Sequence, residues 1–307
     1  MNEVYQKTLA SPVKFNGIGL HSGQKSEITI NPAKENEGII FKRIDLKENN
    51  IIEANFKNVS SAKLCTTLEN KSGAKVSTVE HLLAALYITG IDNAFVEINC
   101  EEVPIMDGSS RDFLTVLLET NLINQTKKRK YLKISDKIEL VDGEKKISIE
   151  PHNSLEVDFQ LKYENKIIGK QKNIIDFQND DLKDVSSSRT FCLFEDIEKI
   201  KKNGLAKGGS LENAVVVDKD KILNNGGLRN DKEFVNHKIL DLSGDFMLSG
   251  HRILGKVICY QGGHELTNLF LKKIFNTAES FKFIELSSYK IPKKVFTKES
   301  EKIAVNA

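Results

Sequence analysis

The sequence has few cysteines, little excess charge of either sign and no long apolar run. Its four cysteines stand singly, without the C-x-x-C pair of many zinc and redox sites, so we interpret them as reduced, mostly buried thiols. No apolar run approaches the roughly 18 residues that a membrane-spanning helix requires. Residues 1–10 contain no apolar core like that of a signal peptide. These absences predict a cytoplasmic globular protein without a transmembrane segment.

The charge balance gives little reason to expect a nucleic-acid partner. Lysine and arginine number 45 and aspartate and glutamate 43, which leaves a formal net charge of +2. A short basic run, Lys127–Lys130, keeps a non-catalytic RNA-binding α+β protein as the alternative from another functional class. With 307 residues, 39% of them hydrophobic and 29% charged, the chain has the length and composition of one large or two compact soluble domains.

The chain repeats one order of predicted elements, which indicates a duplicated α+β fold. Each half contains a helix, a strand, a loop and a second helix. These elements are predicted at residues 77–90, 94–99, 104–108 and 111–120, and again at 234–248, 253–260, 262–263 and 264–274. Alternating apolar and polar residues at 25–31 and 146–150 are typical of half-buried antiparallel strands, and they open each half.

The two halves meet in a polar, basic stretch, residues 124–130, which we predict to be a linker. The alternative is a charged surface loop inside one domain. The predicted boundaries are residues 1–126 for the first half and residues 127–307 for the second. Each half then buries one face of its sheet under its helices, and a site built from both halves would lie in the cleft between them.

The spacing of His237 and Asp241 indicates a metal site. Residues four apart lie on one side of a helix, so an imidazole and a carboxylate at these positions can bind the same ion, and Asp245 continues the stripe. A catalytic zinc needs a third protein ligand, which His81 can supply. Glu80 beside it would place a carboxylate next to the water that the metal activates. This combination is typical of a metal-dependent hydrolase.

Structural interpretations of the same residues stay open. The stripe with His237 and Asp241 lies opposite an apolar one, so it also fits a solvated helix face. Ser77 and Glu80 have the spacing of a capping box, in which Glu80 would accept a hydrogen bond from the Ser77 amide at the start of the helix. His81 by itself also fits a hydrogen-bonded core residue.

Other polar residues have less specific patterns. His264 follows Gly262–Gly263 at a predicted helix start, and it is either an exposed loop histidine or a general acid whose pKa Asp245 would raise. Thr190 fits a hydroxyl donor to a developing oxyanion, and equally an ordinary strand end. The turn Lys207–Ser210 resembles a glycine turn that cradles phosphate. The remaining histidines are predicted to be structural: His21, His152 and His251.

Taken together and in this order, these segments resemble the UDP-3-O-acyl-N-acetylglucosamine deacetylases, zinc enzymes that commit bacteria to lipid A synthesis. The matching segments run from about residue 8 to residue 275, nearly the whole chain, and as a set they are highly specific. They are Gly17–Gly23, Ser77–His81, Ile91–Asn93, Val103–Ser109, Ser188–Phe191, Lys207–Ser210, Asn225–Arg229, His237–Asp245 and Gly262–His264.

The resemblance implies a fold and a site. The implied fold is two similar sheet-plus-helix halves, packed face to face as a duplicated two-layer sandwich, each with a small insert. The implied site lies where the halves meet, and its zinc ligands are His81, His237 and Asp241. Iron(II) is the alternative occupant of such a site. The implied catalytic residues are the base Glu80, the acid His264, its orienting partner Asp245 and the oxyanion donor Thr190.

The resemblance also implies a small-molecule substrate, UDP-3-O-(3-hydroxyacyl)-N-acetylglucosamine, from which a monomeric enzyme removes acetate. A deacetylase of another acylated amino sugar is the alternative. Lys238 would bind the substrate, and the second insert, residues 191–217, would form an apolar passage for the acyl chain, although these residues also fit ordinary core around a strand at Val215–Val217. The implied contacts in the passage are Phe191, Leu193, Ile197, Ala206, Ser210, Ala214 and Val216. Ala206 stands where the family often has cysteine, which affects the width of the passage.

Overall fold

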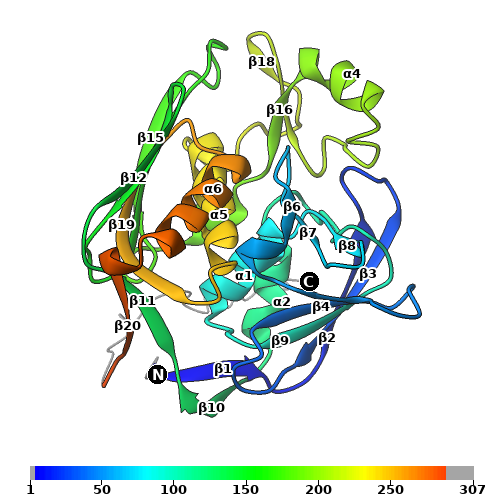
Figure 1. Ribbon diagram of the computed structural model, residues 1–307. Helices are drawn as coiled ribbons and strands as arrows, with labels where there is room; N and C mark the ends of the chain where they lie inside the picture. Colours follow the sequence, from blue (N-terminus) through cyan, green and yellow to red (C-terminus); the bar gives the residue numbers. More distant parts are fainter. Residues whose placement is uncertain (1–3, 288–307) are drawn as a thin grey trace, which may run out of the picture.

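The protein, described for residues 4–287 in a computed structural model, has helices enclosed between two β-sheets (Figure 1). The enclosed helices are α1 (Glu80–Thr89), α2 (Arg111–Glu119), α5 (Glu233–Met247) and α6 (His264–Asn276). One sheet lies outside α1 and α2, and the other lies outside α5 and α6. The chain is therefore mixed helix and sheet, which confirms the predicted α+β class.

The first sheet comes from the N-terminal half of the chain. Its strands lie in the order β2-β3-β9-β4-β5, and all neighbours are antiparallel except β9 and β4. The bounds are β2 (Val13–Ile18), β3 (Lys25–Pro32), β4 (Ile39–Arg43), β5 (Ile51–Glu53) and β9 (Ala94–Ile98). Buried and exposed side chains alternate along β3, because one face of the sheet packs on the helices and the other faces outward.

The second sheet repeats this order. Its strands β12-β13-β19-β14-β15 pair with the same directions, and the parallel pair is again the third and fourth, β19 and β14. Two strands, β11 and β20, extend the sheet beside the start of β19. The bounds are β11 (Lys130–Ile134), β12 (Ile138–Asp142), β13 (Lys145–Glu150), β14 (Leu155–Lys162), β15 (Lys170–Asp176), β19 (Arg252–Tyr260) and β20 (Phe281–Glu285). This shared strand order confirms the predicted duplication.

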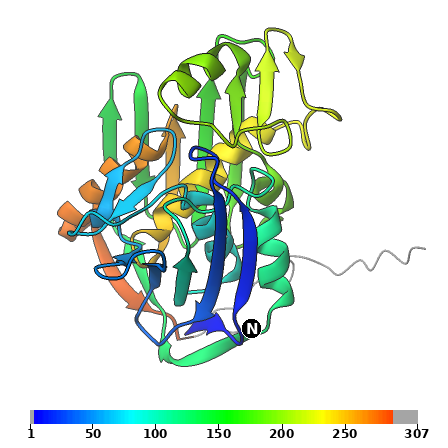
Figure 2. The same cartoon turned by 90° about the vertical axis from the view of Figure 1, so that its right-hand side faces the viewer.

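Each half carries an insert: the first lies between β5 and α1, and the second lies between β15 and α5. The first insert contains η1 (Phe56–Asn58) and a three-stranded sheet of β6 (Val59–Ser61), β7 (Thr67–Glu69) and β8 (Lys75–Val76). The second contains α3 (Lys183–Ser187), β16 (Phe191–Leu193), α4 (Phe194–Lys202), β17 (Val215–Asp218) and β18 (Lys221–Ile222). The second insert projects at the top of the molecule in both views (Figure 1, Figure 2).

Helices α1 and α5 pack against each other at the centre of the molecule. A glycine permits this approach, because a Cβ at Gly244 would collide with the carbonyl oxygen of Glu80. Nearly every residue of both helices is buried, since each has its own sheet on one side and the other half of the chain on the opposite side. The solvated-face interpretation of the stripe with His237 and Asp241 is therefore wrong.

Most of the segment predicted as a linker lies in a strand. β10 (Leu122–Lys128) pairs antiparallel with β1 (Tyr5–Leu9), and its side chains are mostly exposed and polar. The sequence does not indicate this strand, because backbone pairing orders the segment and leaves no apolar pattern in it. That the segment joins the two halves stays a prediction. The predicted boundary after residue 126 falls inside β10 and stays a prediction. Residues 288–307 of the predicted second half lie outside the described residues.

The four cysteines are free thiols, as predicted. Cys65, Cys100 and Cys259 are buried, and Cys192 is half-buried. Burial raises the pKa of Cys65 and that of Cys259 to about 12, so both stay protonated. Within residues 4–287, none of the helices has the length and apolar character needed to cross a membrane.

Candidate metal centre

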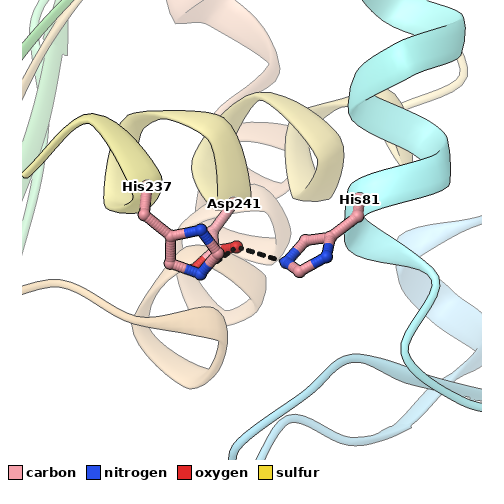
Figure 3. A group of neighbouring side chains, drawn as sticks. All are labelled: His81, His237 and Asp241. Carbon is pink, nitrogen blue, oxygen red and sulfur yellow. Dashed lines mark ion pairs between the residues drawn. The ribbon is translucent and has the colours of Figure 1, made fainter. Parts of the chain in front are cut away.

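Helices α1 and α5 bring three potential metal ligands together from the two halves of the chain (Figure 3). His237 and Asp241 lie one turn apart on α5, and His81 is the second residue of α1. The Nε2 atoms of His81 and His237 are each 3.4 Å from Oδ1 of Asp241, and one ligand atom from each residue lies within 4.8 Å of the others. All three side chains are buried. Two imidazoles and a carboxylate match the protein ligands of a catalytic zinc site.

The hydrogen bonds around these residues fit a bound cation. Oδ1 of Asp241 is buried, and none of the described residues donates a hydrogen bond to it. A buried carboxylate oxygen without a partner is costly, and a cation held between it and the two imidazoles would remove that cost. Nδ1 of His237 lies 3.1 Å from the carbonyl oxygen of Ser188, an acceptor that leaves the lone pair on Nε2 for a metal.

The protonation states of the ligands also suit a cation. Burial lowers the pKa of His237 to about 3, so its imidazole is neutral, as a metal ligand must be. Burial opposes the ionised form of Asp241, but the neighbouring His237 and Lys238 outweigh it and hold the pKa of this carboxyl well below its usual range. Nζ of Lys238 is 2.9 Å from Oδ2 of Asp241, so the second carboxylate oxygen already has a partner.

Glu80 is the first residue of α1 and does not form the predicted capping box. Its Oε2 accepts a hydrogen bond from the backbone N–H of Thr66 at 3.0 Å, and the Ser77 hydroxyl donates to the carbonyl oxygen of Glu101. The helix begins three residues later than predicted, because Thr78 has a positive φ of 56° that is incompatible with a right-handed helix. Burial raises the pKa of Glu80, which makes its carboxylate a better proton acceptor.

His264 is buried at the start of α6, so its interpretation as an exposed loop residue is wrong. Its Nδ1 is 2.8 Å from Oδ2 of Asp245, and its Nε2 is 3.7 Å from Oε1 of Glu80. Burial alone would lower the pKa of His264, but the charges of Asp245 and Glu80 outweigh it and raise the pKa to about 10. The imidazole is therefore protonated at neutral pH, and it can donate a proton beside a carboxylate that can accept one.

Known proteins share this chain's sequence over almost its full length. Residues 6–276 match the family described as UDP-3-O-acyl N-acetylglycosamine deacetylase. The chain belongs to this family. Relatives named UDP-3-O-acyl-N-acetylglucosamine deacetylase from Pseudoalteromonas translucida and Pasteurella multocida are each 40% identical to it, over 91% and 92% of this chain and 93% of each relative. One of the same name from Idiomarina loihiensis is 42% identical over 92% of this chain and 93% of the relative.

In this member of the deacetylase family, a pocket opens over the three ligands. The predicted site residues that line it are Glu80, His81, Thr190, His237, Lys238, Asp241 and His264. The rest of its wall is Leu20, His21, Leu64, Thr78 and Ile105. Asp245 is absent from this wall and contacts the ring of His264 from behind. The structure therefore brings the predicted ligands and the predicted catalytic groups to one small volume between the halves.

The residues predicted for the acyl passage are only partly near this pocket. Nζ of Lys238 lies 5.6 Å from the ring centroid of Phe191, which also contacts the ring of His237. Neither Phe191 nor any of the other predicted contacts lines the pocket itself. Of these contacts, Ala214 and Val216 are buried, Ser210 is exposed, and the remainder are half-buried: Phe191, Leu193, Ile197 and Ala206. The passage stays a prediction.

The turn Lys207–Ser210 does not have the free amides of a phosphate cradle. The N–H groups of Lys207 and Gly208 donate to the carbonyl oxygens of His21 and Leu20, at 3.2 and 3.0 Å. The N–H groups of Gly209 and Ser210 donate within the insert. The hydrogen bonds of Lys207 and Gly208 instead connect the second insert to the β2–β3 loop.

Two residues near the site were not identified from the sequence. His21, predicted to be structural, lines the pocket, and both its ring nitrogens are buried without a hydrogen-bond partner among the described residues. Its place in the segment Gly17–Gly23, which carries part of the family resemblance, was a usable signal. Thr66 contacts Glu80 and Asp245 but lies in the irregular first insert, where no sequence pattern marks it.

Proposed function

We propose that the protein removes acetate from UDP-3-O-acyl-N-acetylglucosamine with the help of one zinc ion, as a step of lipid A biosynthesis. One observation carries this proposal: a chain of this family holds His81, His237 and Asp241 within ligand distance of one another, beside Glu80 and His264. Iron(II) would suit the same ligands. A bound divalent ion would supply Lewis-acid polarisation of the amide and a lower pKa for the attacking water.

The chain's own residues would move the protons. Glu80 accepts the proton of the attacking water through Oε1, the oxygen that Thr66 leaves free. His264 donates the proton on Nε2 to the departing amine, which leaves poorly as an anion. The Thr190 hydroxyl donates a hydrogen bond to the oxygen that becomes negatively charged, and Lys238 binds the substrate at the rim. Because Oε1 of Glu80 and Nε2 of His264 are 3.7 Å apart, both can reach one amide group.

The proposed reaction also leads to expectations about the oligomeric state, the location of the reaction and RNA binding. All the proposed ligands and catalytic groups come from one chain, so we expect the monomer to be active. A nucleotide-linked substrate supports a reaction in the cytoplasm. The basic run at 127–130 supports RNA binding poorly, because Arg129 is buried and paired with Asp92, with Nη2 and Oδ2 2.7 Å apart.

The rate is expected to fall at alkaline pH, when His264 loses its proton. The raised pKa of about 10 places this loss above neutrality. Asp245→Asn removes the largest of the charges that raise this pKa, so the alkaline limb of kcat/KM should move down by at least about one pH unit. The measurement is the pH profile of kcat/KM for both proteins. Coincident alkaline limbs would exclude His264 as the proton donor.

The acyl chain is expected to contribute strongly to catalysis. Each buried methylene contributes roughly 0.8 kcal/mol, so partial burial of a long chain can position the amide over the metal ligands. A UDP-N-acetylglucosamine substrate without the 3-O-acyl chain should lose at least about 100-fold in kcat/KM. The measurement is kcat/KM for acetate release from the two substrates. Equal kcat/KM values would show that the acyl chain does not bind to the protein.

A charge in the second insert tests where that chain binds. Ala214 is buried, and a charge there would disturb the core, whereas Leu211 is 45% exposed. Leu211→Glu should therefore reduce kcat/KM on the acylated substrate far more than on the bare UDP-sugar. Leu118→Glu, on the equally exposed outer side of α2, is the matched control and should change neither. Equal losses of Leu211→Glu on both substrates would contradict a passage in this insert.

Acetate release from UDP-3-O-acyl-N-acetylglucosamine is the experiment that tests the proposed reaction. The purified protein should release acetate and leave a free amine on the sugar. An intact, metal-loaded protein that releases none would contradict it. If acetate came from a different acylated amino sugar at a higher kcat/KM, the alternative substrate would be correct.

A further inference from the structure

Thr66 contacts two of the three carboxylates that lie beside His264, those of Glu80 and Asp245; the third, Oδ2 of Asp241, is 3.9 Å from Nε2 of His264. Thr66 is a buried residue at the end of the loop that connects β6 to β7 in the first insert. Its backbone N–H donates to Oε2 of Glu80 at 3.0 Å, and its hydroxyl donates to Oδ1 of Asp245 at 2.7 Å. The other oxygen of each carboxylate faces the imidazole, with Oε1 of Glu80 3.7 Å from Nε2 and Oδ2 of Asp245 2.8 Å from Nδ1. Thr66, Glu80, His264 and Asp245 thus form a closed ring, the Thr66 ring.

The hydrogen bonds of the Thr66 ring reduce the electrostatic repulsion between buried carboxylates in the site. Three buried carboxylates, those of Glu80, Asp241 and Asp245, lie beside one imidazole, and like charges repel strongly where water is excluded. Hydrogen bonds to the oxygens that face away from His264 stabilise the carboxylates of Glu80 and Asp245, and bonds to charged groups are stronger than neutral ones. They also fix the rotation of each carboxylate, since a carboxylate held at one oxygen points the other in a defined direction.

The backbone carbonyl of Thr66 also contacts the start of α1. The carbonyl oxygen accepts a hydrogen bond from the N–H of Val79, the residue just before α1, at 3.4 Å. Thr66 is followed at once by Thr67, the first residue of β7. Thr66 does not line the pocket, and its hydrogen bonds to the described residues include none to the three metal ligands. Any effect on the reaction must therefore act through its two carboxylate partners.

We infer that Thr66 is a positioning residue that orients Glu80 directly and His264 through Asp245. This inference rests on the proposed function, because it concerns the proton acceptor and donor of that reaction. The backbone N–H fixes Glu80 whatever the side chain, whereas only the hydroxyl fixes Asp245. Removing the hydroxyl should leave substrate binding intact and slow the step in which His264 donates its proton.

Thr66→Val tests this, because valine keeps the shape of threonine and the backbone N–H but lacks the hydroxyl. We expect kcat on UDP-3-O-acyl-N-acetylglucosamine to fall about 10- to 100-fold, and KM to change by less than about threefold. Thr66→Ser retains a hydroxyl and should restore kcat to within about threefold of the wild type. Thr67→Val is the matched control in the next residue, and it should stay within about twofold of the wild type.

A double-mutant cycle shows whether the hydroxyl acts through Asp245. In an Asp245→Asn protein, adding Thr66→Val should cause no further loss of kcat, because the partner of the hydroxyl has already changed. Thr66→Ala is made in parallel, since it removes the same hydroxyl without inserting a methyl group into a hydroxyl's place. Thermal unfolding and metal content of each variant show that the protein is folded and loaded.

The outcomes separate this inference from the proposed function. The inference is supported if kcat falls in Thr66→Val or Thr66→Ala, recovers in Thr66→Ser and falls no further when Thr66→Val is added to Asp245→Asn. With an active wild type, any one of three results would overturn it. These are full activity without the hydroxyl, a Thr66→Ser protein as slow as Thr66→Val, and additive losses of kcat with Asp245→Asn. A folded, metal-loaded wild type that releases no acetate would overturn the proposed function, and this inference with it.

Discussion

The His237→Ala protein is expected to lose its bound metal and at least about 100-fold in the rate of acetate release. Only two ligands, His81 and Asp241, would remain, and a site with two protein ligands retains a catalytic ion poorly. Oδ1 of Asp241 lacks a hydrogen-bond donor among the described residues, so none of them can compensate for the loss of the cation. Metal content per chain after dialysis, measured together with the rate, checks this result.

His81→Ala and Asp241→Ala should give the same loss, since each removes one of the three ligands. His152→Ala is the control, because this half-buried histidine bonds to Ser154 and does not line the pocket. It should keep both metal and activity. Near-normal metal content in all three ligand variants would show that the ion binds elsewhere.

The Glu80→Gln protein is expected to keep its fold and its metal but to react about 10²- to 10⁴-fold more slowly. Glutamine has the same shape, and its side-chain oxygen can still accept the hydrogen bond from the N–H of Thr66. It cannot take a proton from water. We therefore expect little change in the melting temperature, and a large fall in kcat.

Glu101→Gln is the matched control, because Glu101 is an exposed carboxylate outside the pocket. It should leave the rate unchanged. If Glu80→Gln instead lowered the melting temperature and turned over normally, Glu80 would be a structural residue at the start of α1, and another group would have to accept the proton.

The helical part of the site was predictable from the sequence. His237 and Asp241 lie four residues apart, and the helical repeat alone puts them on one side of α5. The sequence could not show that this side is buried, because the covering surface is α1 from the other half of the chain. Gly244 marks the crossing of the two helices, but a single glycine in a helix does not reveal which backbone it meets.

The predictions that failed concern residues whose contacts are made with distant segments of the chain. Ser77 and Glu80 matched a capping box, yet the N–H of Thr66 binds the Glu80 carboxylate in the folded chain. Thr66 reaches Asp245 across 179 positions of sequence, a distance at which no local pattern operates. Strand β10 was missed for a similar reason, since its polar side chains carry no apolar alternation and its order comes from pairing with β1.

We propose that acetate release requires a single divalent ion held by His81, His237 and Asp241. The most direct test removes the metal from the wild-type protein with a chelator and then adds back zinc in increasing amounts. We expect the metal-free protein to be inactive towards UDP-3-O-acyl-N-acetylglucosamine, and activity to return in proportion to zinc until about one ion per chain is bound. A folded, metal-free protein that released acetate at the rate of the untreated protein would contradict the account.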